Sequence, residues 1–173
     1  SHNVVPVKNC LIQNEKINKI VEICVLFLNK YKISVYNEKT KKGIVRNIYV
    51  RNTDVGVMAV IVTNSNKKLS HFQDLVDMLV KEGVDSIIQN VNTKDTNVIM
   101  GDENIVLYGN DKILAKIGDL KFYISSKSFF QVNTNQTKVL YDEALKMADI
   151  TKDDTVFDLF CGCGTISLYL AKT

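Results

Sequence analysis

One stretch near the end of the chain, residues 155–171, constrains the fold more than any other. It reads T-V-F-D-L-F-C-G-C-G-T-I-S-L-Y-L-A. The short apolar run 156–160 predicts a strand buried on both faces of a parallel sheet. Gly162 and Gly164 predict a sharp turn, and the apolar positions from Ile166 onward predict an amphipathic helix. This order favours a cofactor cradle, because the free amides and the positive dipole end of the helix face the turn.

Two classes of cofactor site share this arrangement, and the spacing of small residues distinguishes them. A dinucleotide fingerprint has G-x-G-x-x-G or A, but the third small position here is Ser167. The pattern D-x-x-x-G-x-G beginning at Asp158 resembles instead motif I of the class I methyltransferases, which bind S-adenosylmethionine. Asp158 would supply a hydrogen-bond acceptor at the end of the strand. An ordinary strand-to-helix connection remains a third interpretation, since short glycine motifs also occur by chance.

Composition and charge narrow the class of protein only slightly. An apolar fraction of 46% over 173 residues is enough for a folded core, in one domain or two small ones. No apolar run approaches the roughly 20 residues of a membrane span and no signal-peptide pattern is present, so we expect a cytoplasmic protein. The formal net charge of +3 does not by itself indicate a nucleic-acid-binding protein. The spacing of the four cysteines predicts neither a disulfide framework nor a metal site.

Residues 1–127 are predicted to form an α+β domain, with a mostly antiparallel sheet and helices on one side. Helical periodicity predicts a helix over 14–30. A second helix is predicted to begin at a capping box of Ser70 and Gln73 and to end at Gly83. The predicted strands are 44–51, 55–62, 84–91, 105–108, 112–117 and 120–125.

Two further local features are predicted along the chain. The G-N-D turn at 109–111 predicts a hairpin between strands 105–108 and 112–117. A third helix is predicted to run to about Ala148, with Asn133 and Gln136 capping its start.

The only two arginines, Arg46 and Arg51, are predicted to lie on opposite faces of the strand at 44–51. Each could bind a phosphate or carboxylate through its planar fork, or form an ion pair at the rim of the sheet, and the sequence leaves both open. A basic rim that grips RNA phosphates would use the following residues. They are Lys39, Lys41, Lys42, Arg46, Lys67 and Lys68.

Residues 126–136, S-K-S-F-F-Q-V-N-T-N-Q, are poorly explained by helix or strand periodicity. With the motif at 158–165, D-L-F-C-G-C-G-T, they resemble the bacterial RNA (uracil-5-)-methyltransferases that form 5-methyluridine in 23S ribosomal RNA. The resemblance also includes Gln136 and Tyr141 of the following helix. Weaker support comes from V-V-P-V-K-N-C-L-I-Q at 4–13 and from G-I-V-R-N-I-Y-V-R at 43–51.

The resemblance implies two domains and a cofactor. Residues 1–127 would form a central α+β domain that contacts RNA, and residues 128–173 would form the first strand–helix unit of an incomplete Rossmann-like domain that binds S-adenosylmethionine. The residues implied for the cofactor site are Gln131, Asp158, Phe160, Gly162, Gly164 and Thr165. Some relatives have Asn at the position of Thr165.

Cys10 is similar in position to the last cysteine of an iron–sulfur ligand set found in part of the family. Its companions would lie upstream of Ser1, so a cluster is expected only in a longer parent protein. For Cys10 itself we expect a buried thiol.

The family's reaction adds a cysteine thiolate to uracil C6, transfers the methyl group to C5, and removes the C5 proton with a carboxylate base. The resemblance implies that the nucleophile and the base follow later strands, beyond Thr173, so Cys161 and Cys163 are not expected to be the nucleophile. The expectation is a methyltransferase parent acting on ribosomal RNA, with these 173 residues inactive alone and containing no catalytic residue.

The strand at 156–160 would then lack neighbours. It is expected to dock on the first domain, to pair with a second copy in a dimer, or to be disordered. The alternative functions are a non-catalytic RNA-binding module, based on the basic rim, and an NAD-dependent enzyme. The latter would need an acidic residue after a second strand.

Overall fold

The structure is a computed structural model that describes residue 7, residues 9–11 and residues 13–171. The chain divides into two compact units, and each is described by itself. Unit 1 consists of residues 1–52, as far as they are described, and 57–111. Unit 2 consists of residues 53–56 and 112–173, with the same restriction. The main division therefore falls between Asp111 and Lys112, earlier in the chain than the boundary expected at 127/128.

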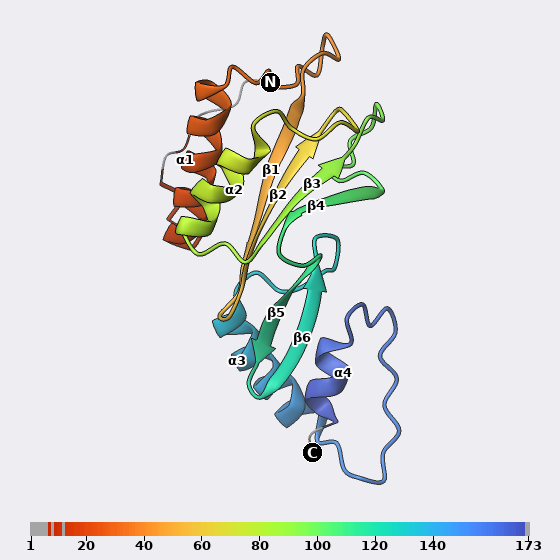
Figure 1. The fold of residues 1–173 in the computed structure, drawn as a ribbon. Coiled ribbons are helices and arrows are strands. Elements are labelled where there is room, and N and C mark those ends of the chain that lie inside the picture. Colours follow the sequence, from red (N-terminus) through yellow and green to blue (C-terminus); the bar gives the residue numbers. More distant parts are fainter. Residues whose placement is uncertain (1–6, 8, 12, 172–173) are drawn as a thin grey trace. The chain divides into compact units, whose positions relative to one another are not determined.

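Unit 1 is built on a four-stranded mixed sheet with the strand order β1–β2–β3–β4 (Figure 1). The strands are β1 (Val45–Asn52), β2 (Val57–Thr63), β3 (Ser86–Val91) and β4 (Glu103–Tyr108). The outer pairs β1/β2 and β3/β4 are antiparallel, while β2 and β3 are parallel. A parallel pair needs a crossover, and α2 provides it between β2 and β3. The predicted α+β class is confirmed, with a mixed sheet.

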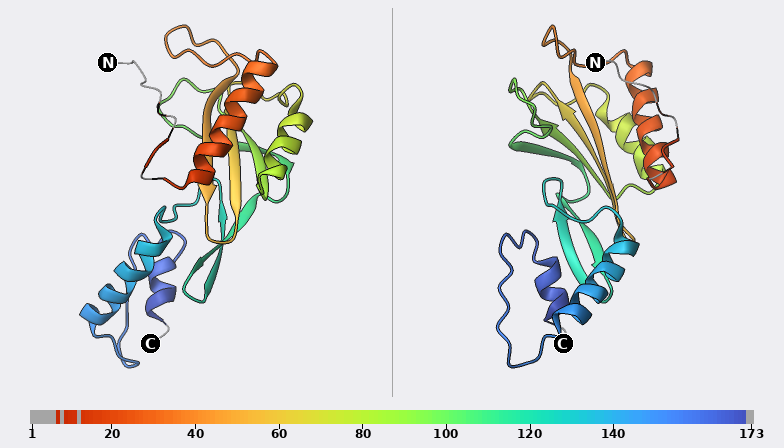
Figure 2. Two further views of the ribbon diagram at one scale, coloured as in Figure 1. Left: turned by 90° about the vertical axis from the view of Figure 1, so that its left-hand side faces the viewer. Right: turned by 180° about the vertical axis from the view of Figure 1, so that it is seen from behind.

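Two helices, α1 (Glu15–Lys30) and α2 (Phe72–Lys81), cover one face of this sheet (Figures 1 and 2). α1 begins as predicted, because the side chain of Asn14 accepts a hydrogen bond from the amide of Lys16. Ile20 and Phe27 of α1 are fully buried in the core cluster below. All residues of β2 and of β3 are buried, which explains the nearly continuous apolar sequence of β2.

The predicted capping box of α2 is wrong. The N-cap residue is His71, in the left-handed conformation, and its side chain makes no capping hydrogen bond. The amide group of Gln73 donates instead to Asp77, one turn further along the helix, at 3.0 Å. Gly83 lies directly after the C-cap residue Glu82, as the sequence predicted.

Unit 2 contains a two-stranded antiparallel ribbon and two helices (Figure 2). These elements are β5 (Lys112–Ile117), β6 (Leu120–Ser125), α3 (Thr134–Ala148) and α4 (Thr165–Leu170). The predicted hairpin between 105–108 and 112–117 is wrong, because β4 pairs with β3 and β5 pairs with β6. Ile117 pairs with Leu120 across a two-residue G-D turn, and the buried positions of β5 and β6 alternate in matching register.

Residues 53–56 form the turn between β1 and β2, yet they belong to unit 2. The hydroxyl of Thr53 donates to the carbonyl of Leu114 in β5 at 2.7 Å. The hydroxyl of Thr134, the first residue of α3, donates to the carboxylate of Asp54 at 2.8 Å. This turn is therefore held by side-chain contacts to both the ribbon and α3.

None of the helices in the described part of the chain is long and apolar enough to cross a membrane.

Candidate functional site

The S-F-F-Q-V-N segment leads from β6 into α3. The hydroxyls of Ser125 and Ser128 lie 2.9 Å apart and close a tight turn. Phe130 is buried and packs against Phe122 of β6, with 5.9 Å between ring centroids. Because Phe130 is the buried residue here, its neighbours Phe129 and Gln131 are left at the surface, exposed and half-buried respectively.

The start of α3 is capped as predicted. The side chain of Asn133 accepts a hydrogen bond from the amide of Gln136 at 3.1 Å. On the helix itself, Thr137 and Tyr141 are the buried positions. The apolar residues Val139 and Met147 of the same helix are exposed.

The predicted buried strand at 156–160 is wrong for this chain. Among the described residues this segment pairs with no strand, and all but the half-buried Asp158 are exposed, with Phe157 81% exposed. A parallel central strand needs hydrogen-bonded neighbours and helices over its faces, and local sequence cannot replace them. The carboxylate of Asp158 accepts a hydrogen bond from the hydroxyl of Ser167 in α4. Asp158 is therefore tied to the first turns of the helix.

The glycine turn before α4 has the conformation that its sequence predicts. Gly162 and Gly164 have φ of 57° and 68°, which favours glycine, and the amide of Gly164 closes the turn on the carbonyl of Cys161 at 2.8 Å. A Cβ atom added at either glycine would meet nothing within 4 Å. The turn is thus open, so that a ligand can approach its backbone closely. Phe160 shares the left-handed conformation with φ of 64° and is fully exposed.

Thr165 is the first residue of α4, and its side chain is fixed by α3. The hydroxyls of Thr165 and Tyr141 lie within hydrogen-bonding distance at 2.8 Å. The rings of Tyr141 and Tyr169 pack edge to face with 5.5 Å between their centroids. Tyr169 also donates a hydrogen bond to Asp142, which pairs with Lys138 at 2.6 Å. The hydrogen bonds from Lys138 and Tyr169 lower the pKa of the Asp142 carboxyl, so this contact holds an ionised carboxylate.

Five of the six expected cofactor residues lie in one short stretch, from Asp158 to Thr165. The sixth, Gln131, belongs to the segment before α3. The thiol of Cys163 links the two stretches, because it donates to the carbonyl of Phe129 at 3.4 Å. The sequence alone does not indicate that Tyr141 and Ser167 support this turn. Ser167 lies nine residues after Asp158, across a glycine turn, and no local periodicity predicts such a contact.

Neither arginine of β1 is a free surface cation. The guanidinium of Arg46 is buried and binds backbone carbonyls of the loop after β3. The guanidinium of Arg51 lies 5.3 Å from the ring centroid of Tyr49. For Arg46 the structure therefore adds an internal role that the sequence had not suggested.

The structure describes Cys10 but only part of the N-terminal motif at 4–13. Cys10 is half-buried, and its amide donates to the side chain of Asn18 at 3.5 Å. Of the motif at 4–13, residues 4–6, 8 and 12 lie outside the described residues, as do Ser1, His2 and the last two residues of the chain. Among the described residues there is no group of three or more His, Cys, Asp or Glu that could hold a metal ion.

Comparisons with known proteins cover nearly the whole chain. No family model matches it. It is 47% identical to an uncharacterized RNA methyltransferase of Clostridium tetani, over 99% of this chain and 38% of that protein. It is 44% identical to one of Clostridium acetobutylicum, with the same coverage. The chain thus spans 38% of the length of these curated relatives.

A solved structure has the same fold. It is the Pyrococcus abyssi tRNA (uracil-54, C5)-methyltransferase in complex with S-adenosyl-L-homocysteine, which matches with a TM-score of 0.80 and 26% identity. The match covers 98% of this chain and 41% of that one. Over nearly its whole length the chain is therefore similar to part of known RNA methyltransferases. The solved structure that shares its fold is a uracil-C5 methyltransferase that acts on tRNA.

Proposed function

We propose that these residues are part of a longer enzyme that transfers a methyl group from S-adenosylmethionine to C5 of a uridine in RNA. The observation that carries the proposal is the structural likeness, over 98% of the chain, to a protein described as a uracil C5 methyltransferase. The two motifs at 128–133 and 158–165 support it independently, because their sequences resemble those of the RNA (uracil-5-)-methyltransferases. An RNA substrate also fits a cytoplasmic location.

The RNA that we propose as substrate is ribosomal RNA, on the resemblance of those motifs. The solved relative acts on uridine 54 of a tRNA by its description. The two classes of substrate therefore have to be compared directly. A common chemistry at uracil C5 is expected for both.

For the cofactor we propose a site made from two parts of unit 2. The open glycine turn at 161–164 offers backbone amides, Thr165 offers a hydroxyl held by Tyr141, and Asp158 offers a carboxylate. Gln131 would contact the cofactor from the segment before α3, and the exposed ring of Phe160 would pack beside it. S-adenosylmethionine supplies the methyl group when it is bound, and these residues would bind and orient it. We propose that residues 128–173 act as part of the cofactor domain and that residues 1–127 contact RNA.

No residue of the 173 is proposed to be catalytic. The thiol of Cys163 is engaged with the carbonyl of Phe129, and Cys161 belongs to the cofactor turn itself. We therefore expect the 173-residue chain to show no methyl transfer alone. Turnover by this chain on uridine-containing RNA would contradict that part of the proposal.

The reaction is tested with the full-length protein and unmodified transcripts of 23S ribosomal RNA and of tRNA. RNA labelled with tritium at uracil C5 should release tritium to water as the methyl group is added, because the C5 proton must leave. Nucleoside analysis should then find 5-methyluridine in the ribosomal transcript. Methylation at another atom would overturn the proposal of C5 methylation. Methylation of tRNA alone would overturn the proposal that ribosomal RNA is the substrate.

The cofactor site is tested with Gln131→Ala in the full-length protein. Loss of an amide contact should weaken binding of S-adenosylhomocysteine about tenfold, as expected for roughly 1.4 kcal/mol. Asn135→Ala, an exposed neighbour in the first turn of α3, is the matched control and should leave the affinity unchanged. Isothermal titration calorimetry measures both. Equal affinities for wild type and Gln131→Ala would remove Gln131 from the site.

A further inference from the structure

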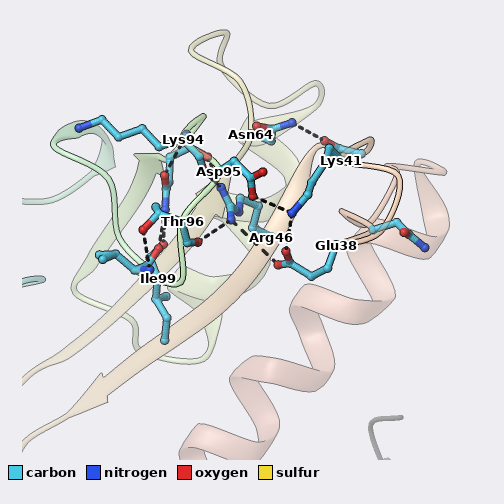
Figure 3. Close-up of polar contacts among 12 residues, drawn as sticks. Glu38, Lys41, Arg46, Asn64, Lys94, Asp95, Thr96 and Ile99 are labelled. Atoms are coloured by element: carbon cyan, nitrogen blue, oxygen red, sulfur yellow. Dashed lines mark hydrogen bonds and ion pairs between the residues drawn. The ribbon is translucent and has the colours of Figure 1, made fainter. Parts of the chain in front are cut away.

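Three loops of unit 1 meet at one end of its sheet. Loop 36–43 precedes β1, loop 64–69 follows β2, and loop 92–102 connects β3 to β4. The register places them together, because Val45 pairs with Thr63 and Thr63 with Val91. Direct contacts join them as well. The side-chain amide of Asn64 donates to the carbonyl of Gly43 at 3.4 Å, and Lys41 pairs with Asp95 at 2.6 Å (Figure 3).

Arg46, at the start of β1, fastens loop 92–102 to this end of the sheet. Its side chain is only 4% exposed. One terminal nitrogen donates to the carbonyls of Asn92 and Lys94, at 3.0 and 2.7 Å, and the other donates to that of Thr96 at 3.4 Å (Figure 3). The planar fork that could have gripped a phosphate is therefore used inside the protein.

Loop 36–43 is attached to the same guanidinium. Arg46 stacks over the ring of Tyr36 with 4.5 Å between its central carbon and the ring centroid. Its other terminal nitrogen lies 4.0 Å from the carboxylate of Glu38. One buried cation thus contacts two loops that lie far apart in the sequence.

Buried amides of β3 and its end hold the rest of these loops. Asn90 accepts the amide of Gly101 at 2.7 Å and donates to its carbonyl at 3.1 Å. Asn92 donates to the carbonyls of Val98 and Ile99 at 2.7 and 3.0 Å. Both asparagines are almost completely buried, so these bonds are shielded from water. Loop 92–102 is therefore fixed along most of its length.

The buried side-chain amide of Gln89 in β3 holds loop 64–69 by hydrogen bonds to its backbone. It is fully buried, accepts the amide of Leu69 at 2.9 Å and donates to the carbonyl of Lys67 at 2.8 Å. It also donates to the hydroxyl of Thr63 at 3.1 Å. The backbone that carries Lys67 and Lys68 is thus positioned from inside the sheet.

The surface of loops 36–43 and 64–69 is strongly basic. They carry five lysines and one glutamate. Lys41 is engaged with Asp95, and this hydrogen bond raises the pKa of the Lys41 ammonium. The other four are exposed and form no ion pair within the part of the chain that the structure describes: Lys39, Lys42, Lys67 and Lys68. A rigid backbone presenting unneutralised lysines suits a polyanion, because little ordering entropy is lost on binding.

We propose that loops 36–43 and 64–69 form a preorganised surface for the sugar–phosphate backbone of an RNA strand, and that Arg46 and Gln89 are positioning residues that hold these loops without touching the RNA. This inference rests on the proposed function, because it takes RNA to be the substrate. The only aromatic residue in the two loops is Tyr36, and it is half-buried under Arg46. The surface would therefore contribute affinity that depends on salt and not on base sequence.

The surface is tested with the 173-residue chain and a short, unstructured, fluorescein-labelled RNA. Fluorescence anisotropy gives the affinity as a function of KCl concentration. Lys67→Gln/Lys68→Gln should weaken binding and make the plot of log K against log salt shallower by about 1.4, at about 0.7 for each lost phosphate contact. The control, Lys19→Gln/Lys81→Gln, makes the same change in charge at the other end of unit 1. That end is identified by the contact of Lys16 with Gly83.

The control pair should leave the salt dependence unchanged. Equal effects of the two double substitutions would mean that the affinity for RNA depends on net charge alone, and this would overturn the proposed surface. Absence of RNA binding by the unmodified chain would overturn it as well.

The positioning role is tested with Arg46→Lys, which keeps the charge and removes the fork. Amide hydrogen exchange in loops 36–43 and 92–102 should become faster, and RNA affinity should fall severalfold with little change in salt slope, because the lysines that contact phosphate remain. Asn92→Ser loosens loop 92–102, which also holds loop 36–43 through the Asp95–Lys41 pair, and is used if Arg46→Lys does not fold. Faster exchange in loop 36–43 with unchanged RNA affinity would overturn the role of Arg46.

Failure of this inference can be told from failure of the proposed function. In the full-length protein, Lys67→Gln/Lys68→Gln should raise KM for RNA and leave kcat unchanged. If the wild-type protein methylates uridine and the variant has the same KM, only the surface is wrong. If the wild-type protein transfers no methyl group to RNA while the chain still binds RNA through these lysines, only the methyltransferase assignment is wrong.

Discussion

Two glycines of this chain are needed for different physical reasons. A Cβ atom at Gly101 would lie 1.7 Å from the carbonyl oxygen of Val91, a contact that backbone atoms cannot relieve without moving β3. Gly162 has open space around it but a φ of 57°. We predict that Gly101→Ala lowers the free energy of unfolding by about 3 kcal/mol through overpacking. Gly162→Ala should cost about 1 kcal/mol through backbone strain.

Urea unfolding followed by circular dichroism measures both changes. The two variants are controls for each other, because each replaces a hydrogen by a methyl group in a turn. A larger loss of stability in Gly162→Ala would contradict the distinction between steric exclusion and strain.

The cysteines should differ sharply in reactivity. Cys24 is buried in α1, and this burial raises the pKa of its thiol to about 12. Cys161 is exposed in the glycine turn. We predict that iodoacetamide at neutral pH modifies Cys161 in the native protein and modifies Cys24 only after denaturation, because the thiolate is the reactive form. Peptide mass spectrometry gives the two rates, and similar native rates would refute the burial of Cys24.

At the scale of elements, α4 depends on α3 through the hydroxyl pair of Tyr141 and Thr165. We predict that Tyr141→Phe in the full-length protein weakens binding of S-adenosylhomocysteine about fivefold, as expected for the loss of about 1 kcal/mol. Tyr169→Phe is the matched control, since it loses the bond to Asp142 and leaves Thr165 bonded. Calorimetric titration separates the two. An equal loss in both variants would indicate general loosening of α4 and not a role for Thr165.

Elements were predictable from the sequence to the extent that local chemistry determines them. The helix α3 begins at the predicted Asn133 cap, α1 begins where its periodicity predicts, and every predicted strand up to β6 exists with small shifts of its ends. The strand partners of β4 and β5 were not predictable. The turn at 109–111 and the turn at 118–119 are both typical of hairpins, and only packing of the whole sheet decides between them. The segment 156–160 failed for the same reason, because a central strand exists only through its neighbours.

The candidate site was predictable to a similar degree. The left-handed glycines of the turn followed from their residue type. The buried role of Arg46 did not, because its three carbonyl partners lie 46 to 50 residues away. A sequence pattern can indicate that an arginine is available, but the tertiary fold decides whether its fork faces solvent.

At the scale of the whole molecule, the exposed apolar residues are concentrated in unit 2. Phe157, Leu159 and Phe160 form an uncovered run, and Val132 and Met147 are also largely exposed. Apolar area of this kind favours association. We predict that the 173-residue chain self-associates as its concentration rises, and that Phe157→Ser/Leu159→Ser reduces the association.

Sedimentation velocity over a range of concentrations measures this association. The matched control is Val98→Ser/Ile99→Ser, which removes two exposed apolar side chains from unit 1. A monomer at every concentration, or equal effects of the two pairs, would contradict the assignment of the interface to residues 157–159.

The turn at 53–56 limits how recombination can divide the gene for this protein. These four residues are surrounded in the sequence by unit 1, yet their side chains bond to β5 and α3 of unit 2. Neither unit is therefore a single uninterrupted stretch of gene. Recombination between the codons for residues 111 and 112 would transfer residues 112–173 without the turn at 53–56, which contains Thr53 and Asp54. The two units are expected to be exchanged between genomes together, as one piece.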